Sequence, residues 1–463
     1  MASSANNSIS GSGNHPYIPS TDSERAEMLD AIGVGSLDDL IGDIPPEHRH
    51  PRLNLAPGLS EQELAAEFAA IAAENASPAR GYISFLGAGA YRHYIPSTVR
   101  SILQRGEFVT AYTPYQPEAA QGTLQVGFEF QTIICQLTGM EVANAGMYDG
   151  PTAFAEACLM AARITRRTRI GVLSTADARL PGTLMAYSKY QDIELVDIDP
   201  DATEIPDDLA CISIQSPNFF GEIEDVEHLT KLAHEKGALS VVHVNPTALG
   251  MFRPPGDFDA DIVTAEGQPL GVPLAFGGPY VGLFACKRAH IRQMPGRIIG
   301  KTTDTRGRVG YVLTLQTREQ HIRRERATSN ICTSTQLIGL MVTVFVATLG
   351  KQGMKDLAQL CYQKAHYAAA EIGRLAGFEV ESASSGGSSG SGSSGKAYFH
   401  EFVVRCPGPP AAINAALLKR KIIGGLDISD RSDNGMLVCV TETSSKADID
   451  RFVAALGVIG AAR

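Results

Sequence analysis

The 463-residue chain is marked first by what it lacks. It has no tryptophan, and aromatic residues make up 7% of it, which is ordinary for a soluble α/β protein. No apolar run approaches the roughly 20 residues that a membrane helix requires, so we expect no membrane-spanning segment. The net charge of −10 argues against a nucleic-acid-binding protein, because such proteins usually gather lysine and arginine on one face.

Cysteine is present but scattered. The eight cysteines form no CxxC pair and no Cys/His spacing typical of zinc, so no metal site is expected. We interpret them as free buried thiols in a reducing compartment. The opening residues, MASSANNSISGSGNHP, show neither an apolar signal-peptide core nor the arginines of a mitochondrial presequence. The expected location is the cytoplasm.

The stretch that organises the chain is residues 240–282. The mostly apolar residues 238–242 precede a polar turn, and a second short strand over 260–265 opens into a loop rich in glycine and proline. Strands and helices alternate from 169 to 265, which predicts one mostly parallel sheet. The pattern therefore predicts an α/β fold.

Two chemical anchors are missing from this stretch. The first strand ends in VHVN at 242–245, with no carboxylate, and the loop after the second reads EGQP at 266–269, with no lysine. Pyridoxal-phosphate (PLP) enzymes of the aspartate-aminotransferase fold place an aspartate at the first point and the Schiff-base lysine at the second. Gln268 offers only an amide, and the nearest downstream lysine is Lys287. We interpret this as a vestigial cofactor site.

A possible phosphate cup lies in YDGPT, residues 148–152, before a helix expected over 153–163. A glycine and a threonine that open a helix can point backbone amides at an anion, and PLP enzymes of this fold hold the phosphate at this junction. Gly150 and Thr152 are therefore candidate cofactor-binding residues. Pro151 removes one donor and is equally explained by helix initiation.

Residues 81–125 form a loop-rich segment with many polar aromatic side chains. Gly87 and Gly89 permit backbone angles closed to other residues, and three prolines stiffen the path. Such a segment usually lines a cleft, although tyrosine rings can also pack a loop onto its own domain. The candidate catalytic residues on it are His93, Tyr94, Tyr112, Tyr115 and Gln116.

Changes in composition predict three regions. Residues 1–80 are expected to form an N-terminal arm of small helices without a core, and residues 81–350 a large domain that carries the sheet. Residues 351–463 are expected to form a small C-terminal α+β domain. The run SASSGGSSGSGSSG, within 382–395, interrupts this domain with a flexible linker composition, which favours a replacement of the native loop.

Several long segments together resemble one known family. They read YTPYQPEAAQGTLQ (112–125), MYDGPTAFAEA (147–157), QSPNFFGEIED (215–225) and GQPLGVPLAFGGPYVG (267–282). These segments are similar to the N-terminal half of glycine decarboxylase, the P-protein of the glycine cleavage system. In organisms where the enzyme is split, that half is a separate subunit.

The resemblance implies a fold-type-I PLP-dependent transferase fold, similar to aspartate aminotransferase. It also implies decarboxylation of glycine and transfer of the aminomethyl group to the lipoyl group of H-protein. PLP would be held by the second subunit, with which this chain would form a heterodimer or a dimer of heterodimers. The turn at Gly277 and Gly278 would then touch the partner's PLP phosphate, although a tight turn between strands explains it too.

Two rival interpretations remain open from sequence. One is a self-sufficient PLP enzyme, such as a lyase or transaminase, that uses Lys287 or Lys301. The other is a structural pseudo-enzyme subunit that contributes only surface.

Overall fold

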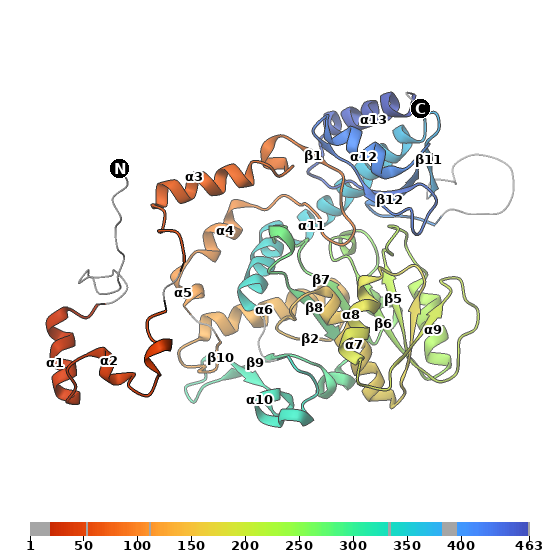
Figure 1. Ribbon diagram of the computed structural model, residues 1–463. Helices are drawn as coiled ribbons and strands as arrows, with labels where there is room; N and C mark the ends of the chain where they lie inside the picture. Colours follow the sequence, from red (N-terminus) through yellow and green to blue (C-terminus); the bar gives the residue numbers. More distant parts are fainter. Residues whose placement is uncertain (1–18, 52–53, 111–112, 332–334, 382–395, 462–463) are drawn as a thin grey trace, which may run out of the picture. The chain divides into compact units, whose positions relative to one another are not determined.

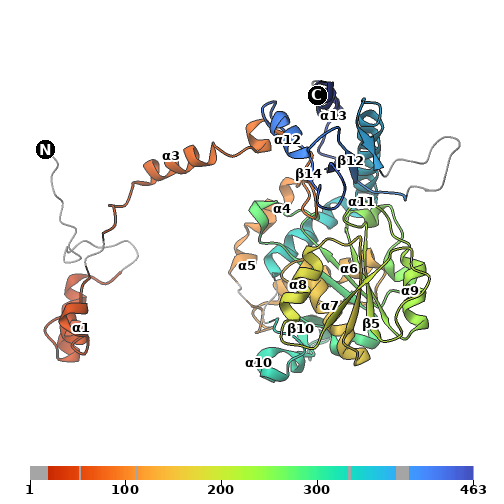
Figure 2. The same ribbon diagram turned by 45° about the vertical axis from the view of Figure 1, so that its right-hand side comes forward.

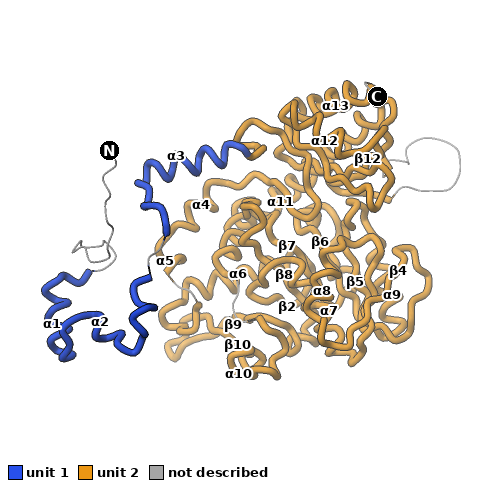
Figure 3. Tube along the Cα trace, viewed as in Figure 1, with its two compact units in different colours: residues 1–74 blue, residues 75–463 orange. Residues whose placement is uncertain are grey.

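The computed structural model describes residues 19–51, 54–110, 113–331, 335–381 and 396–461. The chain divides into two compact units, residues 1–74 and residues 75–463, which are coloured separately in Figure 3.

The first unit consists of short helices that depend on local interactions. Each of its three α-helices begins with a capping box, and Thr21 and Glu24 form the first of them. None of its described residues is buried. The elements are α1 (Asp22–Ile32), α2 (Leu37–Leu40), the 3₁₀ helix η1 (Pro46–His48) and α3 (Glu61–Ala72).

A seven-stranded sheet forms the centre of the second unit (Figures 1 and 2). Its order is β2-β8-β7-β6-β5-β3-β4, and the pairs from β7 to β4 are all parallel. β8 runs antiparallel to β7 and to β2. The strands are β2 (Val142–Ala143), β3 (Arg169–Leu173), β4 (Glu194–Ile198), β5 (Leu209–Ser216), β6 (Leu239–Val244), β7 (Ile262–Glu266) and β8 (Gly282–Cys286).

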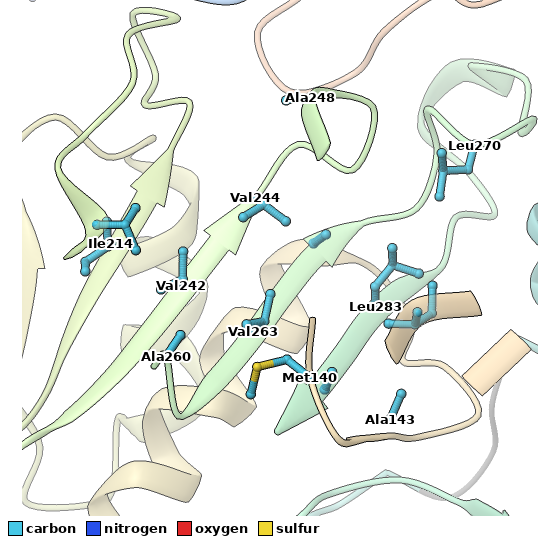
Figure 4. Close-up of a cluster of buried hydrophobic side chains, with 14 of the residues drawn as sticks. Met140, Ala143, Ile214, Val242, Val244, Ala248, Ala260, Val263, Leu270 and Leu283 are labelled. Atoms are coloured by element: carbon cyan, nitrogen blue, oxygen red, sulfur yellow. The ribbon is translucent and has the colours of Figure 1, made fainter. Parts of the chain in front are cut away.

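Both faces of this sheet are buried, because successive side chains of a strand point to opposite faces. Val242 and Val263 belong to one buried cluster, which appears in Figure 4, whereas Val241 and Ile262 belong to another. The first cluster is completed by side chains of α6 (Gln121–Thr138), α9 (Val226–Glu235) and α11 (Gln336–Ile372). The second is completed by side chains of α7 (Gly150–Thr165) and α8 (Arg179–Ser188). The mostly parallel α/β sheet expected from the sequence is confirmed.

Helices of the second unit pack around this sheet. They are α4 (Ser97–Leu103), α5 (Gly106–Val109), α6 (Gln121–Thr138), α7 (Gly150–Thr165), α8 (Arg179–Ser188), α9 (Val226–Glu235), α10 (Gln320–Arg323), α11 (Gln336–Ile372), α12 (Pro410–Leu418) and α13 (Lys446–Ala461).

Helix α11 is the one helix among the described residues that is long and apolar enough to cross a membrane, judged by length and composition. Its backbone leaves helical geometry at Gly350, where φ is 62° and ψ is −176°, so two helices meet there. Phe345 of the first half is 1% exposed and packs into the core under the sheet.

A second, four-stranded sheet has the order β11-β12-β15-β14 and is antiparallel throughout. The run 382–395 lies outside the described residues and connects β11 to its neighbour β12. A short parallel pair, β1 with β13, attaches the start of the second unit to this region. The strands are β1 (Ile83–Ser84), β11 (Glu379–Val380), β12 (Glu401–Arg405), β13 (Ile422–Ile423), β14 (Leu426–Asp427) and β15 (Gly435–Cys439).

Some expected elements differ from the observed ones. Strand β2 has only two residues, because the chain then turns, and Met147 makes an isolated bridge to Gly282. The helix expected from 153 begins at Gly150, since Asp149 caps it. The antiparallel hairpin of β9 (Ile298–Thr303) and β10 (Val309–Thr314) was not expected.

Candidate functional site

A cavity of about 260 Å³ lies at the carboxyl ends of the central strands. Gln215, Asn245 and Glu266, which line it, come from the ends of β5, β6 and β7 or directly after them. Parallel α/β folds bind their ligands at this edge of the sheet. Glu266 and Pro269 of this lining belong to the loop where the sequence predicts a vestigial cofactor site, and that role stays a prediction.

Gln268 is not among the residues that line the cavity, and its side-chain amide is hydrogen-bonded within the chain. Its side-chain nitrogen donates to the backbone oxygens of Tyr91 and Val272, at 2.8 and 2.9 Å, and its side-chain oxygen accepts from the Tyr91 N–H at 2.8 Å. The side chain is buried, and the residue is 2% exposed. At the position expected for a cofactor lysine, the chain has a fully bonded structural amide.

The expected phosphate cup is occupied by carboxylates of the chain itself. The Gly150 N–H donates to Glu266 Oε2 at 2.8 Å, and the Thr152 N–H donates to Asp149 Oδ1 at 2.8 Å. Glu266 Oε1 accepts the Gln268 N–H at 2.9 Å. Burial raises the pKa of the Glu266 carboxyl to about 7, although the hydrogen bonds from Gly150 and Gln268 oppose the shift.

A second buried carboxyl, Glu401 of β12, lies on another wall. Its oxygens accept from the Ala88 N–H and the Tyr91 hydroxyl, both at 2.6 Å. Burial raises the pKa of Glu401 to about 7 and that of the Tyr91 hydroxyl well above its usual range. Arg179 lies beside them, and its Nε donates to both oxygens of Asp177 at 2.9 Å.

Two buried imidazoles complete the lining. His243 of β6 contacts the Thr264 hydroxyl through Nδ1 at 2.9 Å, and burial lowers its pKa to about 4. His400 contacts the Asn245 side chain through Nε2 at 3.1 Å, and burial holds its pKa well below the usual range. Both rings are neutral near pH 7, so neither offers a cation to a phosphate.

This cavity does not fit PLP. No lysine is among the described residues that line it, and the end of β6, VHVN at 242–245, offers no carboxylate to hold a protonated pyridine nitrogen. The amides of Gly150 and Thr152 already bind carboxylates. The donor set therefore lacks the covalent anchor, the pyridine partner and the phosphate site.

Of the candidate catalytic residues, His93 and Tyr94 meet at Glu442. His93 Nδ1 lies 2.7 Å from Glu442 Oε2, and the Tyr94 N–H donates to Oε1 at 2.6 Å. The Cys361 thiol donates to the same carboxylate at 3.4 Å. The His93, Cys361 and Glu442 atoms lie within 4.8 Å of one another, a spacing that also suits a metal ion. Because hydrogen bonds already join these atoms, the cluster is complete without an ion.

Tyr115 and Gln116 lie in a different environment, and both are exposed. The Tyr115 hydroxyl accepts from Arg297 at 3.0 Å, and the guanidinium lies 5.1 Å from the ring centre. His321 meets the ring edge at a centroid distance of 5.9 Å. Tyr112 lies outside the described residues.

The turn that carries Gly277 and Gly278 is exposed and strained. Phe276 is 100% exposed and has a φ of 54°, and its neighbour Ala275 also has a positive φ of 42°. Positive φ values are costly for residues other than glycine, and such strain concentrates at ligand and interface sites. Gly277, with a φ of 105°, itself lines the cavity.

Comparisons with known proteins agree with this geometry. The sequence profile of the family described as "Glycine cleavage system P-protein" matches residues 15–456. The chain belongs to the glycine cleavage system P-protein family. It is 48% identical to "Probable glycine dehydrogenase (decarboxylating) subunit 1" of Desulfitobacterium hafniense, over 96% of this chain and 99% of that protein. The protein of the same name from Geobacillus kaustophilus is 47% identical, with the same coverage.

Solved structures place the fold in the same family of enzymes. A crystal structure of glycine decarboxylase (P-protein) in inhibitor-bound form matches with a TM-score of 0.88 and 37% identity, over 96% of this chain and all of that one. A sphingosine-1-phosphate lyase of Burkholderia pseudomallei, at 16% identity and a TM-score of 0.61, shares the fold. The expected P-protein resemblance, fold-type-I fold and glycine dehydrogenase subunit function are confirmed.

Within this P-protein fold, several lining residues were not identified from sequence. Glu266 stands two positions before Gln268 in the same loop, so a search for any anion near the expected lysine could have found it. Glu401 and His400 come from the C-terminal region, 310 positions from Tyr91 in the case of Glu401, and no local pattern marks them. His243 was visible only as part of the buried strand β6.

Proposed function

We propose that this chain is the glycine dehydrogenase subunit that holds no PLP and that completes an active site whose cofactor belongs to a second subunit. The observation that carries this proposal is the state of its own cavity. Gln268 and Glu266, at the positions of the lysine and the phosphate cup, are both used in hydrogen bonds within the chain. The names of the relatives, which end in "subunit 1", support a second subunit.

The overall reaction in this proposal is decarboxylation of glycine, with release of CO₂ and transfer of the aminomethyl group to the lipoyl group of H-protein. The partner-held PLP supplies the electron sink for loss of CO₂. This chain supplies neutral hydrogen-bond donors and a wall that excludes water from the reacting groups. The assembly is proposed to be a heterodimer or a dimer of heterodimers in the cytoplasm. Free cysteines at 135, 158, 211, 286, 361 and 439 are consistent with that location.

His93 is the proposed proton carrier for the lipoyl sulfur. The ionised Glu442 beside it makes Nδ1 the donor, which leaves Nε2 as the basic nitrogen. Burial raises the pKa of Glu442, but hydrogen bonds and charge lower it more, so it lies below its usual range. The hydrogen bond with His93 is the largest of the lowering contacts. Glu442 also binds the Tyr94 N–H, so it fixes both candidate residues on the same short segment.

Tyr115, Gln116 and Tyr112 are proposed to line the partner's site. Tyr115 supports this role because its ring is 49% exposed, while Arg297 orients its hydroxyl. Gln116 is exposed beside it. Polar aromatic side chains that stand exposed on an ordered segment are suited to contact another chain or a substrate.

Gly277 and Gly278 are proposed to approach the partner's PLP phosphate with their backbone amides. Within this chain these amides donate to the carbonyls of Leu274 at 2.9 Å and Ala275 at 3.4 Å, so the phosphate would have to replace these two bonds. An ideal Cβ on Gly277 would meet no atom within 4 Å, so the turn is open on that side. The adjacent Phe276 has no cover within its own chain. An uncovered aromatic ring beside two glycines supports an interface rather than an ordinary surface turn.

The self-sufficient alternative lacks support in this geometry. Lys287 follows β8, and Cys286 pairs with Ile262 at the start of β7, whereas the cavity lies at the other end of β7. The Lys287 ammonium forms ion pairs of 2.7 Å with Asp259 and Asp261. Lys301 is exposed on the β9–β10 hairpin.

The proposal is tested by Tyr115→Phe in the complex reconstituted with the second subunit. The change keeps the ring and removes the hydroxyl, so we expect decarboxylation of glycine to fall by about 10²-fold while assembly is unchanged. The matched control is Tyr367→Phe, which removes an exposed hydroxyl bonded to Asp450. Tyr112→Phe and His93→Asn extend the series. Full activity in all three variants would show that this segment is scaffold and would refute the proposal.

A further inference from the structure

We propose that the Glu266 carboxylate occupies the place of a cofactor phosphate and keeps phosphate-bearing ligands, PLP included, out of this chain's own cavity. Glu266 ends β7, and its Oε2 accepts the Gly150 N–H in the first turn of α7 at 2.8 Å. Its other oxygen accepts the Gln268 N–H at 2.9 Å. The helix terminus that would receive a phosphate thus already binds an anion.

The three amide positions of this first turn leave no donor for a phosphate. Gly150 donates to Glu266, and Thr152 donates to Asp149 Oδ1 at 2.8 Å. Pro151, between them, has no N–H. A phosphate bound here would have to displace two carboxylates from their hydrogen bonds.

The space between α7 and β7 is also closed. An ideal Cβ on Gly150 would lie 2.8 Å from the Glu266 Cβ and 3.0 Å from its Cα. These distances are shorter than real contacts allow, so glycine is required for the helix to approach the strand this closely. This close packing of the helix against the strand brings the Glu266 carboxylate within hydrogen-bond distance of the Gly150 N–H.

The charge of the lining acts in the same direction. Asp149, Asp177 and Glu401 face the cavity together with Glu266. Arg179 is the only arginine or lysine among the described residues of the lining, and its Nε is bonded to Asp177. Phosphate recognition normally uses arginine or lysine donors. In this cavity the guanidinium of Arg179 donates instead to the Asp177 carboxylate.

The consequence, which goes beyond the proposed function, is that this subunit excludes PLP and the partner subunit binds it. One side chain of this subunit prevents a second, unproductive PLP site, so that the cofactor is available to the partner. This exclusion is a property of the single chain. It can fail while the proposed subunit function stands, because it makes no statement about assembly or glycine turnover.

The test uses the purified full chain, with inorganic phosphate and then PLP as probes. The pH is kept above the Glu266 pKa of about 7, so that this carboxyl is ionised. Glu266→Ala frees the Gly150 amide and removes a negative charge. We expect its affinity for phosphate to rise about tenfold or more over the wild type, measured by calorimetry. Glu266→Gln keeps the side-chain length and removes only the charge, so it should gain a smaller part of this affinity and serves if the alanine variant does not fold.

The matched control is Asp225→Ala, which uncaps α9 by removing the acceptor of the His228 N–H. It should gain no phosphate affinity. The proposal is overturned if neither Glu266 variant binds phosphate more tightly than the wild type. It is equally overturned if Asp225→Ala gains as much, since the effect would then belong to any uncapped helix, or if the wild type binds phosphate in this cavity.

Discussion

The side chain of Gln268 and the backbone of Tyr91 exchange two hydrogen bonds, each 2.8 Å long. A primary amide can do this because it carries a donor and an acceptor side by side, as a neighbouring strand would. Lysine has donors only, so it could not accept the Tyr91 N–H. The position expected for a cofactor lysine therefore ties the segment that carries His93 and Tyr94 to the end of the sheet.

Removing this pairing should destabilise the chain. Gln268→Met keeps the volume but leaves the Tyr91 N–H and C=O and the Val272 C=O buried without partners. We expect the free energy of unfolding to fall by about 3 kcal/mol, measured by chemical denaturation, because each unsatisfied group costs about 1–3 kcal/mol and relaxation recovers a part. The control, Gln191→Met at an exposed position, should change it by less than about 0.5 kcal/mol. Equal stability of both variants would contradict a stabilising role for the hydrogen bonds of Gln268.

Gln268→Lys should not create a PLP-binding subunit. The new amine would stand without a pyridine partner, because the end of β6 at 242–245 reads VHVN and has no carboxylate, and the phosphate cup stays filled by Glu266. Incubation with PLP followed by borohydride reduction should give no stoichiometric label on Lys at position 268, measured by peptide mass spectrometry. A stoichiometric label there would show that the lysine alone was missing.

Phe276 provides a test of the proposed interface. It is 100% exposed, so Phe276→Ser should leave the thermal stability of the isolated chain unchanged. The same change should weaken assembly with the second subunit by about tenfold or more, because buried aromatic anchors carry much of an interface's binding energy. Tyr190, which is 91% exposed, gives the matched control as Tyr190→Ser. Unaltered affinity of the Phe276 variant, measured by analytical ultracentrifugation, would exclude this turn from the interface.

Glu401 should make stability depend on pH. Burial raises its pKa from 4.5 to about 7, so the folded chain holds a proton that the unfolded chain releases. Its contribution to stability is complete below about pH 4.5 and is lost as the pH rises to about 7, by about 1.4 kcal/mol per pH unit and about 3 kcal/mol in all. Glu401→Gln should flatten this decline in urea titrations at several pH values. The exposed control Glu118→Gln should preserve it, and an unchanged slope in the Glu401 variant would refute this assignment.

The sequence predicted the parts of the fold that local patterns determine. The apolar stretches at 238–242 and 260–265 predicted β6 and β7 within a few residues, and the missing lysine was visible directly at 266–269. Strand direction is not encoded locally, so the antiparallel β8 was not foreseen. The β9–β10 hairpin was missed, although the residues between its strands, 304–308, read DTRGR, a turn composition.

The site was harder to predict because its parts meet only in three dimensions. Gln268 is 177 positions from Tyr91, and His93 is 349 positions from Glu442. Sequence could propose Gly150 and Thr152 as an anion cup because a helix begins there. It could not show that Glu266 and Asp149 fill that cup, because hydrogen-bond partners across the sheet leave no periodic signal.

The most direct measurement of the central claim is the location of the cofactor in the complex formed by co-expression with the second subunit. The complex is reduced with borohydride, the subunits are separated, and the pyridoxyl label on each is measured by mass spectrometry. The account predicts one label per second subunit and none on this chain. A stoichiometric pyridoxyl group on Lys287, Lys301 or any other lysine of this chain would contradict it.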